Sequence, residues 1–355
     1  MTASPTTPIL GDDAADAGGP SNVMLLGIDL GTSRSSVVSM TGARKIVESY
    51  VGYPKDPVAR KMLGADVLYG KHALDHRLSV DLYRPLGRGV IKTEDHEKNL
   101  EAVRHLVRRL VELAEPGREQ LVYGVVGVPA EASVGNKKAI IEATEGILDA
   151  VMIVSEPFSV AYGLERMDQA LIVDIGAGTT DLVRMHGTVP TPDDQVSLDV
   201  AGDAVDEKLL ELIQTEYPDA QVTIHMCKRF KEQYGFVSES NTKIEVEMPV
   251  NGKPMVHDIT ALLKQACNTL VDPIVDAIHK LVASFDPDFQ SKLRQNVLLS
   301  GGGGLLDGLN KRVEDGMERI GGGVVTVVED PQFAGAEGAL RLALDMPGDY
   351  WQQLK

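Results

Sequence analysis

Two glycine-containing turns, each directly after an apolar run that ends in an aspartate, have the residue types and spacing to do chemistry. Asp29 precedes the turn at 31–33, and Asp174, 145 residues later, precedes the turn at 176–180. Glycine lets backbone N–H groups approach a phosphate, and a carboxylate on the preceding strand can hold water-coordinated Mg²⁺. One such turn is weak evidence. Two turns can grip a polyphosphate from both sides, with both aspartates facing one metal ion.

A third glycine-rich segment, SGGGGLL at 300–306, follows a predicted strand and precedes a predicted helix. Backbone of this kind can lie flat against a base or a ribose, because no side chain intervenes. Two other nucleotide-binding patterns are excluded. The chain has no GxxxxGK[ST] sequence, and Asp181 stands where the dinucleotide-binding fingerprint requires a third glycine.

The elements that must position these turns alternate between strands and helices. Apolar runs predict strands at 23–30, 121–128, 151–154, 171–175 and 297–300. Helical periodicity predicts helices at 97–114 and 136–150, near 203–217 and over 260–284, and a polar strand pair is predicted near 242–258. With the D-x-G repeat at one domain length, this alternation predicts two similar α/β halves whose parallel or mixed sheets are covered by helices.

The composition and net charge of the chain exclude several classes of function. The 355 residues suggest two or three domains, and 35 Lys plus Arg against 52 Asp plus Glu give a net charge of −17. This acidic balance argues against nucleic-acid binding and against docking to an anionic membrane. Two cysteines and the lack of a long apolar run favour a soluble cytoplasmic protein without direct membrane insertion. Residues 1–22, rich in small residues and Pro, are predicted to be a disordered tail.

Five segments in a fixed order resemble the nucleotide site of the actin-like ATPases. They are GIDLGTSRSS (27–36), GVPAEA (127–132), VDIGAGTTD (173–181), LLSGGGGLLDGL (298–309) and EDPQFAGAEGAL (329–340). The resemblance implies an α/β, duplicated RNase-H-like fold, with ATP or ADP and Mg²⁺ in the cleft between two domains. It implies domain I at 23–165, with an inserted subdomain at about 51–110 and closure by 335–355. It also implies domain II at 166–334, with a small subdomain at about 200–268.

The resemblance also implies roles for individual residues. The phosphates would be bound by Gly31, Thr32, Ser33, Gly176, Ala177, Gly178, Thr179 and Thr180, and the adenosine by Gly302, Gly303, Gly304, Lys231 and Glu232. Asp29 and Asp174 would lie on the metal side and bind Mg²⁺ through water. Glu156, just before Pro157 at a predicted helix start, would position the attacking water, so Glu156 and Asp174 are the catalytic candidates. Arg34 departs from the family pattern, in which many relatives carry a smaller or apolar residue.

Further segments resemble the branch of bacterial actins that aligns magnetosomes: VGYPKD (51–56), SEPFSVAYGLE (155–165), GTVPTPDDQV (187–196), KEQYGFV (231–237) and MPGDYWQQL (346–354). This resemblance implies a cytoskeletal ATPase that polymerises with itself and has magnetosome-associated accessory partners, and whose hydrolysis drives filament turnover. A sugar- or acetate-kinase-type phosphotransferase and a rod-shape or plasmid-segregating actin stay open, because the nucleotide motifs are shared. A chaperone ATPase is not expected, since the chain ends about 15 residues beyond the last segment.

Overall fold

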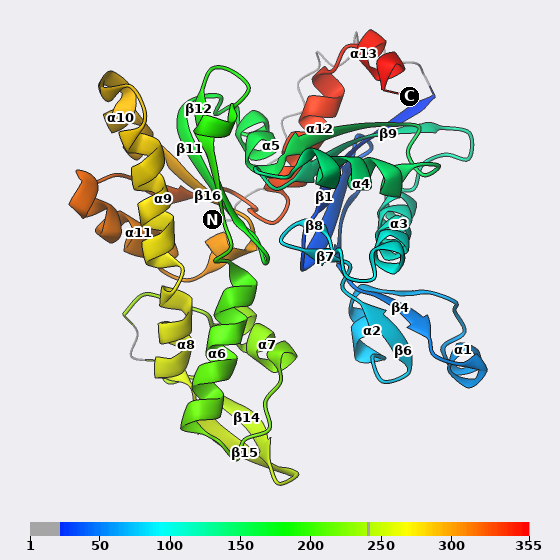
Figure 1. Ribbon diagram of the computed structural model, residues 1–355, viewed down its shortest axis with the longest axis vertical. Helices are drawn as coiled ribbons and strands as arrows, with labels where there is room; N and C mark the ends of the chain where they lie inside the picture. The colour runs from blue at the N-terminus through cyan, green and yellow to red at the C-terminus, as the bar shows by residue number, and fades with distance from the viewer. Residues whose placement is uncertain (1–21, 240–241, 355) are drawn as a thin grey trace, which may run out of the picture.

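The computed structural model describes residues 22–239 and 242–354, and its centre is a pair of five-stranded sheets (Figure 1). The first sheet has the order β10-β9-β1-β2-β3, with bounds Ala150–Ser155, Leu121–Val128, Val23–Leu30, Arg34–Ser39 and Arg44–Glu48. The second has the order β13-β12-β11-β16-β17, with bounds Gln195–Leu198, Thr180–His186, Asp168–Ile175, Val297–Ser300 and Val325–Val327.

The two sheets repeat one topology. In each, the first strand in sequence pairs antiparallel with the next strand and parallel with a much later one, so β1, β2 and β9 correspond to β11, β12 and β16. The predicted duplicated α/β fold is therefore confirmed at the level of strand order. The central strands β9 and β11 are mostly apolar and buried, because both faces of each sheet are covered.

Helices cover these faces. On the first sheet lie α3 (His96–Leu113) and α4 (Val134–Thr144), and on the second lie α9 (Val271–Ala283) and α11 (Leu309–Met317). Helix α3 buries residues that recur every three or four positions, which places them on one face of the helix. Between the two sheets lie α5 (Glu156–Gly163) and α12 (Ala334–Asp345) (Figure 1).

Helices α5 and α12 cross at small residues. A Cβ atom added to Gly338 would overlap the Ser159 carbonyl oxygen, so only glycine permits this close approach. The chain then ends in α13 (Gly348–Gln353), whose buried Trp351 stacks on Tyr123 of the first sheet with ring centroids 5.2 Å apart. The C-terminal segment thus packs on the first sheet.

Each sheet carries a smaller outer subdomain, and the two subdomains lie at the same end of the molecule, at the bottom of Figure 1. On the first sheet it contains β4 (Val51–Pro54), α1 (Pro57–Leu63), β5 (Leu68–Tyr69), α2 (Gly70–Asp75) and β6 (Val80–Tyr83), followed by β7 (Leu86–Gly87) and β8 (Val90–Ile91). On the second it contains α6 (Gly202–Glu216), α7 (Ile224–Tyr234), β14 (Glu245–Val250), β15 (Lys253–Asp258) and α8 (Thr260–Asn268). The remaining helices are α10 (Pro287–Arg294) and the short η1 (Pro192–Asp194), η2 (Gly302–Leu305) and η3 (Glu318–Ile320).

Two predicted helices were wrong in extent. The helix predicted at 260–284 is broken into α8 and α9, because Pro273 has no N–H and its ring cannot lie against the carbonyl four residues earlier. The helix predicted at 136–150 ends at Thr144, and Gly146 then takes a left-handed conformation with φ of +72°. Strand β10 begins soon after this turn, at Ala150.

Within the described ranges, no helix is long and apolar enough to cross a membrane. The tail predicted at 1–22 lies outside the described residues, apart from Asn22. The domain boundaries taken from the family resemblance stay a prediction.

Candidate functional site

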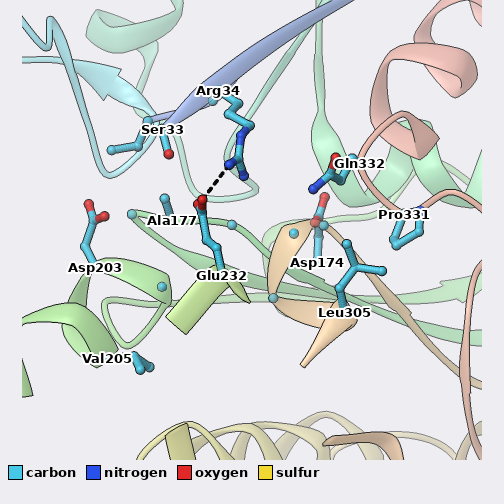
Figure 2. A pocket seen from close by; sticks show the side chains of 18 of the residues that line it. Ser33, Arg34, Asp174, Ala177, Asp203, Val205, Glu232, Leu305, Pro331 and Gln332 are labelled. Carbon is cyan, nitrogen blue, oxygen red and sulfur yellow. Dashed lines mark hydrogen bonds and ion pairs between the residues drawn. The ribbon is translucent and has the colours of Figure 1, made fainter. Parts of the chain in front are cut away.

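A cavity of about 630 Å³ lies where the carboxyl ends of β1 and β11 approach each other between the two halves (Figure 2). It is lined by all of the predicted site residues except Thr180 and Gly304. Thr180 is fully buried and donates a hydrogen bond to the Val200 carbonyl at 2.8 Å. Gly304 is buried against Leu299. The prediction that these two residues contact a nucleotide has no support in the geometry.

The two hairpins in the cavity are equivalent in backbone register. The pair Leu30–Ser35 closes the first loop and the pair Ile175–Thr180 closes the second, with four residues between the partners in each case. The loops touch each other, because a Cβ atom on Gly178 would lie 2.5 Å from the Thr32 hydroxyl oxygen. A glycine is therefore required at this position. The two loops face one shared space, as the repeat in the sequence predicted.

Three acidic side chains, Asp29, Glu156 and Asp174, line the base of this space. Burial raises the pKa of Asp29 to about 6. Burial, together with the charges of Asp29 and Asp181, raises the pKa of Asp174 to about 8. Burial, followed by the charges of Asp29 and Asp174, also raises the pKa of Glu156 well above its usual value. Negative charge is therefore costly here without a cation or protons.

These carboxylates fit a hydrated Mg²⁺ ion rather than a complete protein cage. One oxygen of Asp29 and one of Glu156 are buried without a hydrogen-bond partner in residues 22–239 and 242–354. In the same ranges, no group of three or more His, Cys, Asp or Glu side chains forms a ready-made metal site. Mg²⁺ in nucleotide sites usually keeps several waters and binds one or two carboxylates plus substrate phosphates. The donor set thus matches the predicted water-mediated arrangement.

Glu156 is placed by the junction of β10 and α5. It is the first residue of α5 and Pro157 is the second, one position later than the sequence suggested. The carboxylate lies in the first turn of α5, where the helix dipole favours negative charge. Because Glu156 also lines the cavity, its position allows contact with a water beside bound phosphates.

Lys231 is turned toward its own domain. Its ammonium lies 2.8 Å from Asp206 and donates to the Gly202 carbonyl at 2.6 Å, and both side chains of the ion pair are nearly buried. Burial raises the pKa of Asp206 to about 6, against the opposing effect of Lys231. Lys231 therefore secures α7 against α6 while it lines the cavity. Gly302 has open space where a Cβ atom would be, so the cavity stays clear on this side.

Sequence reasoning missed the contacts that join the halves, and two of them hold the first phosphate loop. Glu232 forms a 2.7 Å ion pair with Arg34, the residue noted above as a departure from the family pattern (Figure 2). Lys228 donates to the Ser33 hydroxyl at 2.6 Å and also lines the cavity. Lys228 could have been found from its position, one helical turn before the Lys231-Glu232 pair.

Comparison with known proteins agrees with this geometry. A family model described as MreB/Mbl protein matches residues 23–347. The actin-like protein MamK of Paramagnetospirillum magneticum is 40% identical over 333 residues, which are 94% of this chain and 96% of that protein. A solved MamK double helical filament has a TM-score of 0.89 at 40% identity, covering 92% of this chain and 100% of that one. A non-polymerising MamK mutant bound to AMPPNP has a TM-score of 0.69 at 40% identity, covering 91% and 99%.

The duplicated sheets and the cleft between them define an actin-like protein. Within that class, the chain belongs to the MreB/Mbl family.

Proposed function

We propose that this chain binds ATP and ADP with Mg²⁺ in the cleft, hydrolyses ATP, and polymerises with further copies of itself into filaments that organise magnetosomes. The observation that carries the proposal is the pair of equivalent hairpin loops facing one cavity with carboxylates at its base. MamK proteins at 40% identity, one described as a double helical filament and one as bound to AMPPNP, support the same reading.

The two loops would bind the phosphates with backbone N–H groups, at 31–33 from one domain and at 177–179 from the other. Short hydrogen bonds already fix the second loop. Gly176 donates to the Thr179 carbonyl at 2.9 Å, and Asp203 donates to the Ala177 carbonyl at 2.8 Å. A loop fixed in this way can bind an anion with little reorganisation energy. Phosphoryl transfer depends mainly on such preorganised positioning and charge stabilisation.

Asp29 and Asp174 would hold Mg²⁺ through its water ligands, and the ion would neutralise phosphate charge. The two raised pKa values support this assignment, because burial disfavours the charged forms of both carboxyl groups and a bound cation would stabilise them. Binding of Mg²⁺ with a nucleotide should therefore release protons at neutral pH, chiefly from Asp174, since Asp29 is already mostly ionised there.

Glu156 would orient the attacking water and accept its proton. Burial and the neighbouring carboxylates raise its pKa, and bound positive charge would lower this pKa and keep the side chain in the ionised form that accepts a proton. Its fixed place at the start of α5, on the cavity lining, supplies the positioning. The nucleoside would lie toward Gly302, Gly303, Lys231 and Glu232, which line the same cavity as the hairpins.

Assembly would use further copies of the same chain as partners, and hydrolysis would drive filament turnover. Accessory proteins on the magnetosome would complete the assembly in the cytoplasm. The structure aligns more closely with the MamK filament subunit than with the non-polymerising mutant, with TM-scores of 0.89 and 0.69 at the same identity. That difference supports a domain arrangement suited to a filament.

Sedimentation of the full chain tests the proposal. At 0.1 M KCl the Debye length is about 10 Å, so the net charge of −17 is screened enough for subunits to stack. We expect a pellet with ATP and Mg²⁺ and a clear supernatant with EDTA. Failure to pellet under all conditions, together with ADP formation that requires an added sugar or acetate, would instead support the kinase alternative.

A further inference from the structure

We propose that α7 of the second domain positions the first phosphate loop across the cleft, through Lys228 on Ser33 and Glu232 on Arg34, and thereby controls nucleotide release. This inference rests on the proposed function, since it assumes that the loop binds phosphate. It assigns Lys228, Glu232 and Arg34 as positioning residues in addition to the backbone groups of the loop.

The two contacts are in register. Lys228 and Glu232 are four residues apart, so their side chains lie on the same face of α7. Their partners, Ser33 and Arg34, are consecutive residues at the end of the first loop, and the distances are 2.6 Å and 2.7 Å. Figure 2 shows Glu232 pointing to Arg34, with Ser33 beside them. Two adjacent loop residues are thus held by one helical face of the opposite domain.

A third contact extends this pattern. Arg84 donates to the Thr32 carbonyl at 3.0 Å and forms a 2.8 Å ion pair with Asp203 at the start of α6. Three consecutive loop residues, at 32–34, are therefore linked to the second domain. The domains cannot separate around this loop without breaking all three links.

Lys228 is also placed to meet a phosphate. Its ammonium contacts the Ser33 hydroxyl and lies 5.8 Å from the centre of the Tyr50 ring. Over the described part of the chain, it forms no ion pair with a carboxylate, whereas Arg34, Arg84 and Lys231 each have one. The Lys228 ammonium at the phosphate loop can therefore form an ion pair with a bound anion. A phosphate bound at Ser33 would supply that charge.

The Arg34–Glu232 pair has a different role. Both side chains are about one third exposed, so the pair is accessible to salt and its strength is modest. Both residues line the cavity beside Ser33, at a part of it that solvent reaches. Because the nucleotide must leave through an opened cleft, breaking this pair should speed release, and added salt should do the same.

The experiment measures the dissociation of a fluorescent ADP analogue from the full chain, below the assembly concentration, at 0.05 M and 0.3 M KCl. We expect Arg34→Glu and Glu232→Arg each to raise the dissociation rate constant by about two- to fivefold or more, as expected for loss of an exposed ion pair. The double variant, with the pair reversed, should return toward the parental rate. Rescue separates the ion pair from any direct contact of Glu232 with the nucleotide.

Lys228 is tested by the affinity of an ATP analogue. Lys228→Met should weaken binding about tenfold or more, because a charge-assisted hydrogen bond is lost, and Lys228→Arg should retain most of it. The matched control is Asp75→Asn, which removes an exposed ion pair with Lys71 inside the first domain and leaves the cross-cleft contacts untouched. This control should behave as the parent in both assays.

Equal dissociation rates in all variants, or a double variant no better than its parents, would overturn the inference while nucleotide binding itself persists. If the parental protein binds no nucleotide, the proposed function fails instead, and the two failures are thereby distinguished.

Discussion

The two phosphate hairpins have the same backbone and different charges. In the first, Asp29 on β1 faces Ser36 on β2, and in the second, Asp174 on β11 faces Asp181 on β12. The extra carboxylate is buried, and it contributes to the higher pKa of Asp174, about 8 against about 6 for Asp29. One strand topology thus carries two electrostatic environments.

The hairpins also differ in what holds them. Backbone hydrogen bonds from the start of α6 fix the second loop, at the Gly176 and Ala177 carbonyls. The first loop has one backbone bond of this kind, from the Ser49 N–H to the Ser33 carbonyl at 2.9 Å, and side chains also hold it, those of Lys228 and Glu232 coming from the other domain. Repetition of a fold therefore does not repeat its function. The second hairpin is a fixed acidic platform, and the first is completed only when the domains meet.

The largest expected effect is that of replacing Glu156, which belongs to neither hairpin. We expect Glu156→Gln to slow ATP hydrolysis by about 10²–10⁴-fold, because the group that orients and deprotonates water is lost. Nucleotide binding and pelleting with ATP should persist, since both loops are intact, and filaments should outlive those of the parent. Phosphate release and light scattering, followed on the same sample, measure both.

A matched variant separates this role from a helix-terminal charge. Asp288 lies in the first turn of α10, away from the cavity, and Asp288→Asn removes a comparable carboxylate. It should leave hydrolysis unchanged. A Glu156→Gln protein with parental phosphate release would mean that Glu156 only stabilises α5.

The second effect compares the two aspartates directly. We expect Asp174→Asn to weaken Mg²⁺-dependent nucleotide binding by about 10–100-fold, the usual cost of losing an outer-shell partner of a metal, and to prevent assembly. Asp29→Asn should weaken it less, because this change leaves the Asp174–Asp181 pair of the more acidic second hairpin intact. Titration calorimetry with and without Mg²⁺ measures the difference. Equal losses would show that the extra carboxylate has no bearing on the metal side.

Sequence alone predicted the hairpins well, because a strand, an aspartate and a glycine turn are local features. It could not predict the Arg34–Glu232 contact, whose partners are 198 residues apart and meet only when the two domains pack. Nor could it tell that Thr180 faces its own domain, since this depends on the orientation of β12. The break before Pro273 is different, because proline in a helical pattern was a visible signal that the predicted long helix overlooked.

Asp29 of the first hairpin and Asp174 of the second should change the stability of the protein over different ranges of pH. Both aspartates have raised pKa values, so the folded protein holds protons that the unfolded chain releases above its pKa of 3.8. The free energy of unfolding of the metal-free protein should therefore fall as pH rises, up to about pH 6 for Asp29 and up to about pH 8 for Asp174. The slope is at most about 1.4 kcal/mol per pH unit for each proton.

Urea unfolding in EDTA, at pH 5 to 8, resolves the two windows. Asp174→Asn should flatten the slope between about pH 6 and 8, whereas Asp29→Asn should flatten it only at lower pH. Added Mg²⁺ and nucleotide should reverse the trend, because they bind the deprotonated form. If the two variants lose slope in the same window, the hairpins do not differ in charge as described.

The smallest effect concerns the residues that close the two loops. Thr180 and Ser35 occupy equivalent positions and point away from the cavity, toward the Val200 carbonyl and the Ser49 hydroxyl. Each of Thr180→Val and Ser35→Ala removes one buried hydrogen bond, which should cost about 1 kcal/mol of stability. Nucleotide affinity should stay parental in both, because neither hydroxyl faces the cavity. The two variants should therefore behave alike. A loss of nucleotide affinity in Thr180→Val alone would show that Thr180 contacts the nucleotide after all. The hairpins would then differ also in the residues that close their loops.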